Sequence, residues 1–169
     1  MKRLIPTMLF AVLSISFLAV APNAVAKDKP SKSQKHFDAL ADSALAAMKA
    51  RAEELKIGGA AVVAYYEGET IQSWSSKMLV VGRYKDEPTA NDKGANLLAI
   101  AYAKAAEMAD LHKDSGSQAR PPMTGEFGWK GGVIAKGKSG YIIAAFSGGK
   151  SEDDAEVSRA GLAKLKTGL

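Results

Sequence analysis

The stretch FSGGKSEDDAEVSRAGL, from Phe146 to Leu162, carries the clearest structural signal in the chain. An apolar run typical of a buried strand ends at Phe146, and paired glycines follow it. Ser151 comes next, with Asp154 three residues later. This spacing is typical of a helix start, where side-chain oxygens bind free backbone N–H groups. We therefore predict a strand, a glycine turn and a capped helix over residues 151–166.

The letters Gly149-Lys150-Ser151 are also similar to the end of a nucleotide-binding P-loop. A P-loop needs a glycine five residues before its last glycine, so that the turn presents backbone N–H groups to phosphates. Ala144 stands at that position. The three acidic residues that follow Ser151 complement the helix dipole and would repel a phosphate. The stretch therefore predicts no nucleotide site.

The first residues have the layout of a secretory signal peptide. Met1-Lys2-Arg3 is a short positive start, Leu4 to Ala21 is apolar, and Ala24-Val25-Ala26 is a small-x-small cleavage site. The alternative is an uncleaved membrane anchor, which the proline and serines within the run disfavour. We predict a signal peptide over residues 1–26, a periplasmic or secreted protein, and no stable membrane insertion after cleavage.

The rest of the 169-residue chain is long enough for one domain with its own core. We predict a flexible tether over residues 27–33, because it combines lysines, two serines and Pro30, and a single domain over residues 34–169. Loss of Lys2 and Arg3 with the leader lowers the formal charge from +5 to +3. No basic stripe is interleaved with aromatic residues, so no nucleic-acid site is expected.

Apolar periodicity in the mature chain predicts helices alternating with strand hairpins. The predicted elements are, in order, a helix over 33–56, strands over 60–66, 69–75 and 77–84, a helix over 95–111, a loop over 112–130, strands over 131–136 and 139–146, and the final helix. Because hairpins pair antiparallel strands, we expect an α+β domain. Its largely antiparallel sheet would have about four or five strands, with helices packed on it.

One family is similar to the chain in its last segment. The ungapped spacing from Ser147-Gly148-Gly149 to Ala160-Gly161-Leu162 resembles the ending of the GlcG/HbpS-type haem-binding family, also seen as the PduO C-terminal domain. The earlier order of helices and strands is also similar. The resemblance implies an exported, non-catalytic, homo-oligomeric protein that binds haem or a related tetrapyrrole.

Candidate ligand residues follow from that implied cofactor. A chain without cysteine has histidine, tyrosine, methionine and lysine to ligate haem iron, so His36 and His112 are the metal candidates. Each histidine also fits a surface position near a helix end. Phe127 and Trp129 could wall a planar ligand or could anchor their loop to the core. The predicted cofactor-binding residues are His36, Phe127, Trp129, Ser147, Gly148 and Gly149.

Motifs for hydrolytic catalysis and for a surface cation site are absent or weak in the sequence. No Gly-x-Ser-x-Gly elbow and no His-x-x-x-His spacing occurs, so hydrolytic catalysis is not expected. Glu152, Asp153 and Glu156 could form a surface cation site, although helix capping and solvation also explain them. A small-organic-ligand or assembly module without haem, or an accessory protein to a metabolic enzyme, is the alternative function.

Overall fold

The computed structural model describes residues 31–169. The predicted signal peptide and the first four residues of the predicted tether lie outside this range. The first helix begins at Lys32, so the last two tether residues belong to the helix. In the described range, no helix combines the length and the apolar character needed to cross a membrane.

Three helices and six strands make up the described chain. They are α1 (Lys32–Glu54), β1 (Gly59–Glu67), β2 (Ser75–Val81), β3 (Lys85–Asp86), β4 (Ala95–Asn96), α2 (Leu97–Leu111), β5 (Gly132–Lys136), β6 (Gly140–Ser147) and α3 (Ser151–Lys166). The predicted α+β class and the order of helices are confirmed.

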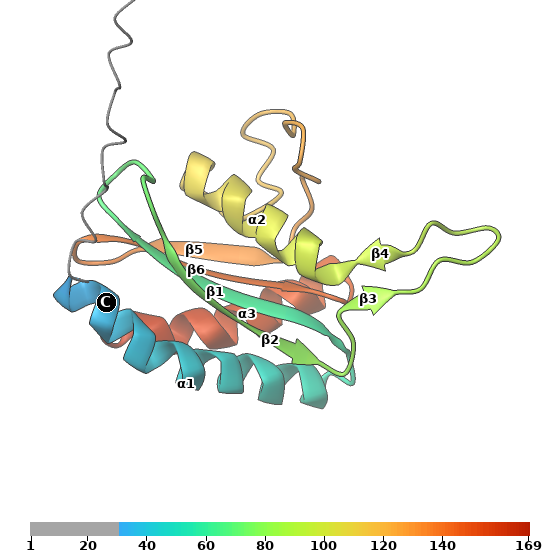
Figure 1. Cartoon of the computed structure of the whole chain (residues 1–169), viewed down its shortest axis with the longest axis horizontal. Helices are drawn as coiled ribbons and strands as arrows, with labels where there is room; N and C mark the ends of the chain where they lie inside the picture. Colours follow the sequence, from blue (N-terminus) through green and yellow to red (C-terminus); the bar gives the residue numbers. More distant parts are fainter. Residues whose placement is uncertain (1–30) are drawn as a thin grey trace, which may run out of the picture.

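The main sheet has four strands in the order β2-β1-β6-β5, and every neighbouring pair is antiparallel. Helices α1 and α3 cover one face, whereas α2 and the loop after it cover the other (Figure 1). β1 and β6 are therefore covered on both faces, and nearly all their residues are buried. This explains why both strands read as continuous apolar runs in the sequence.

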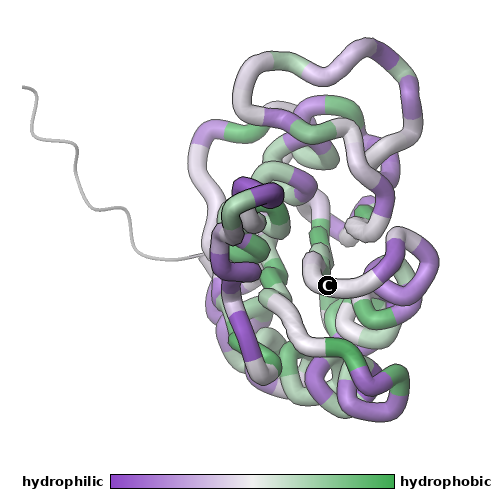
Figure 2. The backbone as a smooth tube through the Cα atoms, turned by 90° about the vertical axis from the view of Figure 1, so that its right-hand side faces the viewer, coloured by the Kyte–Doolittle hydropathy of each residue, from purple (hydrophilic) through white to green (hydrophobic). Residues whose placement is uncertain are grey.

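The core is divided by the sheet into two sides. Residues of β1 and β6 alternate between them: Val63 and Phe146 face α1 and α3, whereas Val62 and Ala145 face α2. Hydrophilic and hydrophobic positions alternate along the outer helices, as expected for helices with one face on a core (Figure 2). The packing leaves Ser147, the last residue of β6, on the α2 side.

The predicted second and third strands are wrong in their bounds. Residues 69–74 form a loop, and a single strand, β2, replaces both predictions, with its pairing to β1 starting at Tyr65↔Ser75. Ile71 is exposed, so its alternation with polar neighbours does not reflect burial. β3 and β4, which were not predicted, form a short ribbon at the base of an exposed arm over residues 82–96 (Figure 1).

The predicted cap of α3 is also wrong in detail. Lys150 is the N-cap and makes no side-chain cap hydrogen bond, and Ser151 is the first helical residue. Asp154 points inward instead of capping from the surface, and its Oδ1 accepts the Gly149 N–H at 2.8 Å. The carboxylate that reads as a surface charge in the sequence is therefore part of the interior.

Candidate functional site

A pocket of about 220 Å³ opens beside the Gly-Gly turn, and we call it the loop pocket. The turn after β6, the first turns of α2 and α3 and the start of the arm's return strand converge there. The residues that line it are Asp86, Ala95, Leu97, Ile100, Lys104, Trp129, Lys130, Ser147, Gly148, Gly149, Ser151 and Asp154. The pocket therefore collects segments that are far apart in the sequence.

A buried ion pair forms part of the loop pocket's wall. Lys104, only 3% exposed, donates from Nζ to Asp154 Oδ2 at 2.9 Å and to the Phe146 carbonyl at 2.8 Å. An ammonium has three N–H donors, so one donor is left after these two bonds. The pair holds α2 against the N-terminus of α3 and places a cation at the pocket.

Burial disfavours the charged forms of both Lys104 and Asp154. It lowers the pKa of the Lys104 ammonium, although Asp154 partly offsets this effect. Burial also raises the pKa of the Asp154 carboxyl, and Lys104 and the Gly149 N–H partly offset that shift. Removing either partner would leave a buried charge uncompensated, so each depends on the other.

The Ser147 hydroxyl faces the same pocket. Ser147 is only 4% exposed, yet its Oγ has no hydrogen-bond partner among residues 31–169. No fully enclosed side-chain oxygen or nitrogen in that range lacks a partner, so this hydroxyl reaches solvent through the pocket. A nearly buried polar group normally has a partner. Ser147 is therefore a hydrogen-bonding group available to a ligand.

The N-terminus of α3 adds backbone donors to the site. The Asp154 N–H makes the first intrahelical bond, to the Lys150 carbonyl, so the N–H groups of the preceding turn have no helical acceptor. No side chain caps them at Lys150. Ser151, the first residue of this turn, lines the pocket. These donors and the helix dipole favour a negative group there.

Arg83 braces the pocket from the arm. Its guanidinium donates to the carbonyls of Gly58 at 2.7 Å and Gly148 at 3.0 Å, and to Asp86 Oδ1 at 2.6 Å. The planar guanidinium can hold three acceptors at once. Arg83 therefore fixes the arm relative to the Gly-Gly turn.

Four of the predicted cofactor-binding residues meet in this pocket. Trp129, Ser147, Gly148 and Gly149 all line it. Phe127 does not, but its ring packs on Trp129 with centroids 4.9 Å apart. Both rings are about half exposed, so neither is an anchor buried in the core. The arrangement favours the interpretation in which the Trp129 ring lies beside a ligand.

The two predicted metal ligands are not brought together. His36 is exposed on α1, where its ring lies against Gly168, whereas His112 follows α2 on the other side of the sheet. The His112 ring stacks on Tyr141 with centroids 4.1 Å apart, and Tyr141 donates to Glu69 at 2.8 Å. Neither histidine lines the loop pocket. Within residues 31–169, no three His, Asp or Glu side chains are grouped to hold a metal ion, and this includes the acidic start of α3.

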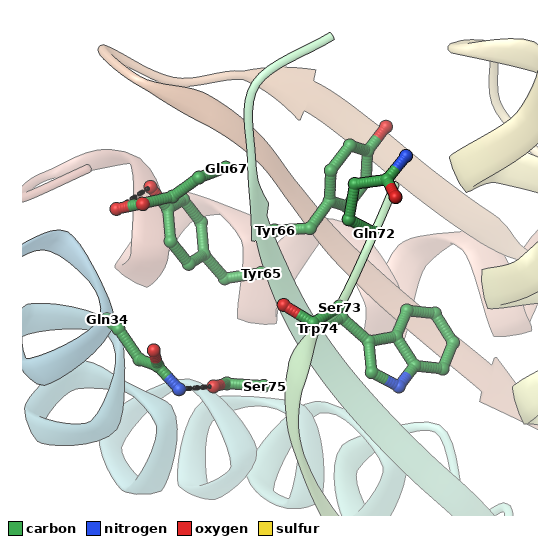
Figure 3. Close-up of a pocket in the computed structure, with 8 residues that line it drawn as sticks. All are labelled: Gln34, Tyr65, Tyr66, Glu67, Gln72, Ser73, Trp74 and Ser75. Carbon is green, nitrogen blue, oxygen red and sulfur yellow. Dashed lines mark hydrogen bonds between the residues drawn. The ribbon is translucent and has the colours of Figure 1, made fainter. Parts of the chain in front are cut away.

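A second pocket lies at the other end of β1, between its last residues and the loop before β2 (Figure 3). Tyr65 and Tyr66 point to opposite sides of the strand there. Its more buried polar groups are already paired: Gln34 donates to Ser75, and the Tyr65 hydroxyl bonds Ser139 at 2.9 Å, whereas Gln72 and Ser73 are exposed. In contrast to the loop pocket, its nearly buried hydroxyls, those of Tyr65 and Tyr66, both have partners.

Arg120 braces the loop over 112–130, which supplies Trp129. Its guanidinium donates to both carboxylate oxygens of Glu126, at 2.7 and 2.9 Å, and to Asp110 at 2.6 Å. Hydrogen bonds from Arg120 and from the Met123 N–H lower the pKa of Glu126 from its ordinary 4.5 to about 2. The charged carboxylate is thus the form that holds the loop together.

The loop is expected to loosen in acid. Because the folded pKa of Glu126 is depressed, its contribution is present above pH 4.5 and is lost as the pH falls towards 2. Fluorescence of Trp129 in a Trp74→Phe background would follow this change, since the chain has two tryptophans. Glu126→Gln should remove most of the transition over this range. An unchanged transition in that variant would contradict the assignment.

Comparisons with known proteins give distant structural likenesses alone. No family model matches the chain, and no curated protein matches its sequence with significance. The fold is similar to the crystal structure of Klebsiella pneumoniae protein ORFY, described as family-model DUF336, which is the GlcG-like family. The two chains are 15% identical, the match covers 75% of this chain and 88% of that chain, and the TM-score is 0.47. Membership of the family suggested by the sequence is therefore a proposal.

Sequence reasoning missed the ion pair under the pocket. Lys104 was seen only as part of an alanine-rich helix, and Asp154 only as a first-turn charge. A signal was present, because Lys104 lies three residues after Ala101 and four before Met108, on the apolar stripe of its helix. A lysine on a buried stripe needs a buried acceptor. Which acidic residue supplies it depends on the tertiary fold.

Proposed function

We propose that the protein is an exported, non-catalytic binding protein of the GlcG/HbpS type that holds a small organic carboxylate in the loop pocket. The observation that carries this proposal is the Ser147 hydroxyl, nearly buried and without a partner in the described chain, beside the Lys104 ammonium. A ligand carboxylate would accept from that hydroxyl, from the remaining Lys104 donor and from the first N–H groups of α3.

The surrounding charges favour a single negative charge on the ligand. Asp154 is already bound by Lys104 and Gly149, and Asp86 is paired with Arg83. Lys130 adds a further cation at the wall. Glu152 and Asp153, exposed or half-buried beside the same helix start, would repel a more strongly charged group such as a phosphate. A carboxylate with an apolar body beside Trp129 suits this arrangement.

The loop pocket does not fit haem, the ligand that the family resemblance implies. No histidine, tyrosine or methionine lines it, and of its two lysines Lys104 is already bonded to Asp154, which leaves Lys130 as the one remaining candidate iron ligand in the pocket. Its volume of about 220 Å³ is below the range of about 300–1,000 Å³ typical of sites for drug-sized ligands. The residues therefore favour the alternative drawn from the sequence, a small organic ligand.

Benzoate is a suitable probe, because it combines one carboxylate with one planar apolar ring. In a Trp74→Phe background it should quench Trp129 saturably, with a Kd of about 1 mM for so small a ligand. Ser147→Ala should weaken binding by about tenfold, because a hydrogen bond to a charged group is lost. The fluorescence titration of both proteins measures this difference.

Two controls separate the pocket from nonspecific contact. Benzyl alcohol, which has the ring without the charge, should bind at least about tenfold more weakly than benzoate. Ser76→Ala removes a hydroxyl on β2 that bonds Tyr102 and does not line the loop pocket, so it should leave the benzoate affinity unchanged. Equal benzoate affinity in Ser147→Ala and its parent would count against the proposal, as would a Soret shift with haemin at micromolar protein.

The expected homo-oligomer is part of the same proposal. Met78 and Val80 on the edge strand β2 are exposed apolar side chains that a second copy could cover. Gly161 of α3, although small enough for close helix contact, packs inside the chain and not between copies. A Cβ there would meet Met48 of α1 at 2.6 Å. Sedimentation of the purified mature chain gives the assembly state directly.

A further inference from the structure

A third cavity lies about one helical turn along α2 from the loop pocket, and we call it the proline pocket. Its volume is about 490 Å³, within the range typical of small-molecule sites. Ala119, Pro121 and Pro122 supply apolar walls, and Gly128 closes tightly on Pro122, where a Cβ would come within 2.5 Å of the ring. The loop over 112–130 thus forms a shaped cavity of its own.

A nearly buried carboxylate lines the proline pocket. Glu107 is only 5% exposed, and its Oε1 accepts the Gly116 N–H at 2.9 Å. Its Oε2 has no partner among the described residues. No fully enclosed side-chain oxygen in that range is unpaired, so Oε2 opens onto the cavity that Glu107 lines. Glu107 is therefore a buried acceptor with one oxygen left for a ligand.

The charges around this cavity are negative on balance. Arg120 also lines it, but its guanidinium is bound by Glu126 and Asp110, so two carboxylates share one cation. Glu107 adds a third carboxylate without a cationic partner in the described chain. A metal ion would need more ligands, and no group of three such side chains is placed to hold one within residues 31–169.

We propose that the proline pocket binds a small organic cation, a primary amine with an apolar body, through Glu107. The ammonium would donate to Glu107 Oε2, and the apolar body would lie against Pro121 and Pro122. This site is independent of the carboxylate site, because the two pockets share no lining residue. The chain would then bind two oppositely charged ligands at neighbouring turns of α2, an anion beside Lys104 and a cation beside Glu107.

The test uses benzylamine, which has the ring of benzoate with the opposite charge. Titration of the ¹⁵N-labelled mature protein at pH 7 should shift the amides of Gly116, Gln118 and Gly128 saturably, at millimolar ligand. Glu107→Gln should weaken binding at least tenfold. This change keeps an oxygen for the Gly116 N–H and removes the charge, so the loop should keep its structure. Asp42→Asn, which removes one exposed carboxylate from α1 on the other side of the sheet, should change the affinity less than twofold.

Three results would overturn the proposal. These are absence of saturable shifts with wild-type protein, equal affinity in Glu107→Gln, and binding of benzyl alcohol as tight as that of benzylamine. If Glu107→Gln does not fold, two measurements on wild-type protein still test the proposal. These are the residues whose amides shift with benzylamine and the relative affinity for benzyl alcohol. Shifts confined to Ser147 and Ser151 would also count against it, since they would place the amine in the other pocket.

Discussion

Lys104→Met is expected to lower the free energy of unfolding by about 3–5 kcal/mol, because it leaves the Asp154 carboxylate buried without its cation. Methionine has nearly the length of lysine and fits the apolar surroundings, so the lost charge dominates the effect. The Phe146 carbonyl also loses a donor. Urea denaturation followed by circular dichroism measures the change.

A double variant separates the ion pair from packing. Lys104→Met with Asp154→Asn removes both charges, and the asparagine oxygen can still accept the Gly149 N–H. Its stability should recover by at least about 2 kcal/mol relative to Lys104→Met alone, because no buried charge is left unpaired. Additive losses in the double variant would contradict the pairing. As a control, Lys49→Met breaks an exposed pair with Glu53 and should cost less than about 1 kcal/mol.

Gly148→Ala is the second change expected to have a large effect. A Cβ at this position would lie 2.1 Å from the Gly58 carbonyl oxygen and 2.6 Å from the Gly59 Cα, and neither backbone atom can move away without disturbing β1. We expect a loss of about 2–3 kcal/mol in stability. Benzoate binding should also weaken, because the displaced turn carries the wall of the loop pocket.

The neighbouring glycine provides the matched control. A Cβ at Gly149 would first meet the Ile57 Cδ1 at 2.9 Å, the end of a flexible side chain that can rotate away. Gly149→Ala should therefore change stability by less than about 1 kcal/mol, and its N–H can still bond Asp154. Thermal unfolding of both variants measures their stabilities. Equal losses of stability would show that the close contact between Gly148 and the Gly58 backbone is not the cause of the effect.

The elements with strong periodicity could be predicted from the sequence. The helix over 151–166 was predicted with the bounds it has, and the apolar runs around Val62 and Ile143 were recognised as strands. The arm and its β3–β4 ribbon were not predicted. Two residue pairs hold this ribbon, and it depends on tertiary contacts such as those of Arg83 with Gly58 and Gly148.

The candidate site was predicted in part. Ser147, Gly148, Gly149 and Trp129 were selected from a family marker and a glycine-rich loop, and they meet in one pocket. The charged groups were not selected, because their roles depend on which elements pack together. Lys104 and Asp154 are 50 residues apart, and neither shows from its neighbours that the other is its partner. His36 was selected by elimination of other iron ligands, and the sheet separates it from the pocket.

Carboxylate binding in the loop pocket is tested most plainly by a ¹H–¹⁵N correlation titration of the mature protein with benzoate. We expect saturable shifts at the amides of Ser147, Gly149 and Ser151, which line the loop pocket, and their loss in Ser147→Ala. Absence of shifts at these amides, or saturable shifts only at residues outside the loop pocket, would contradict it.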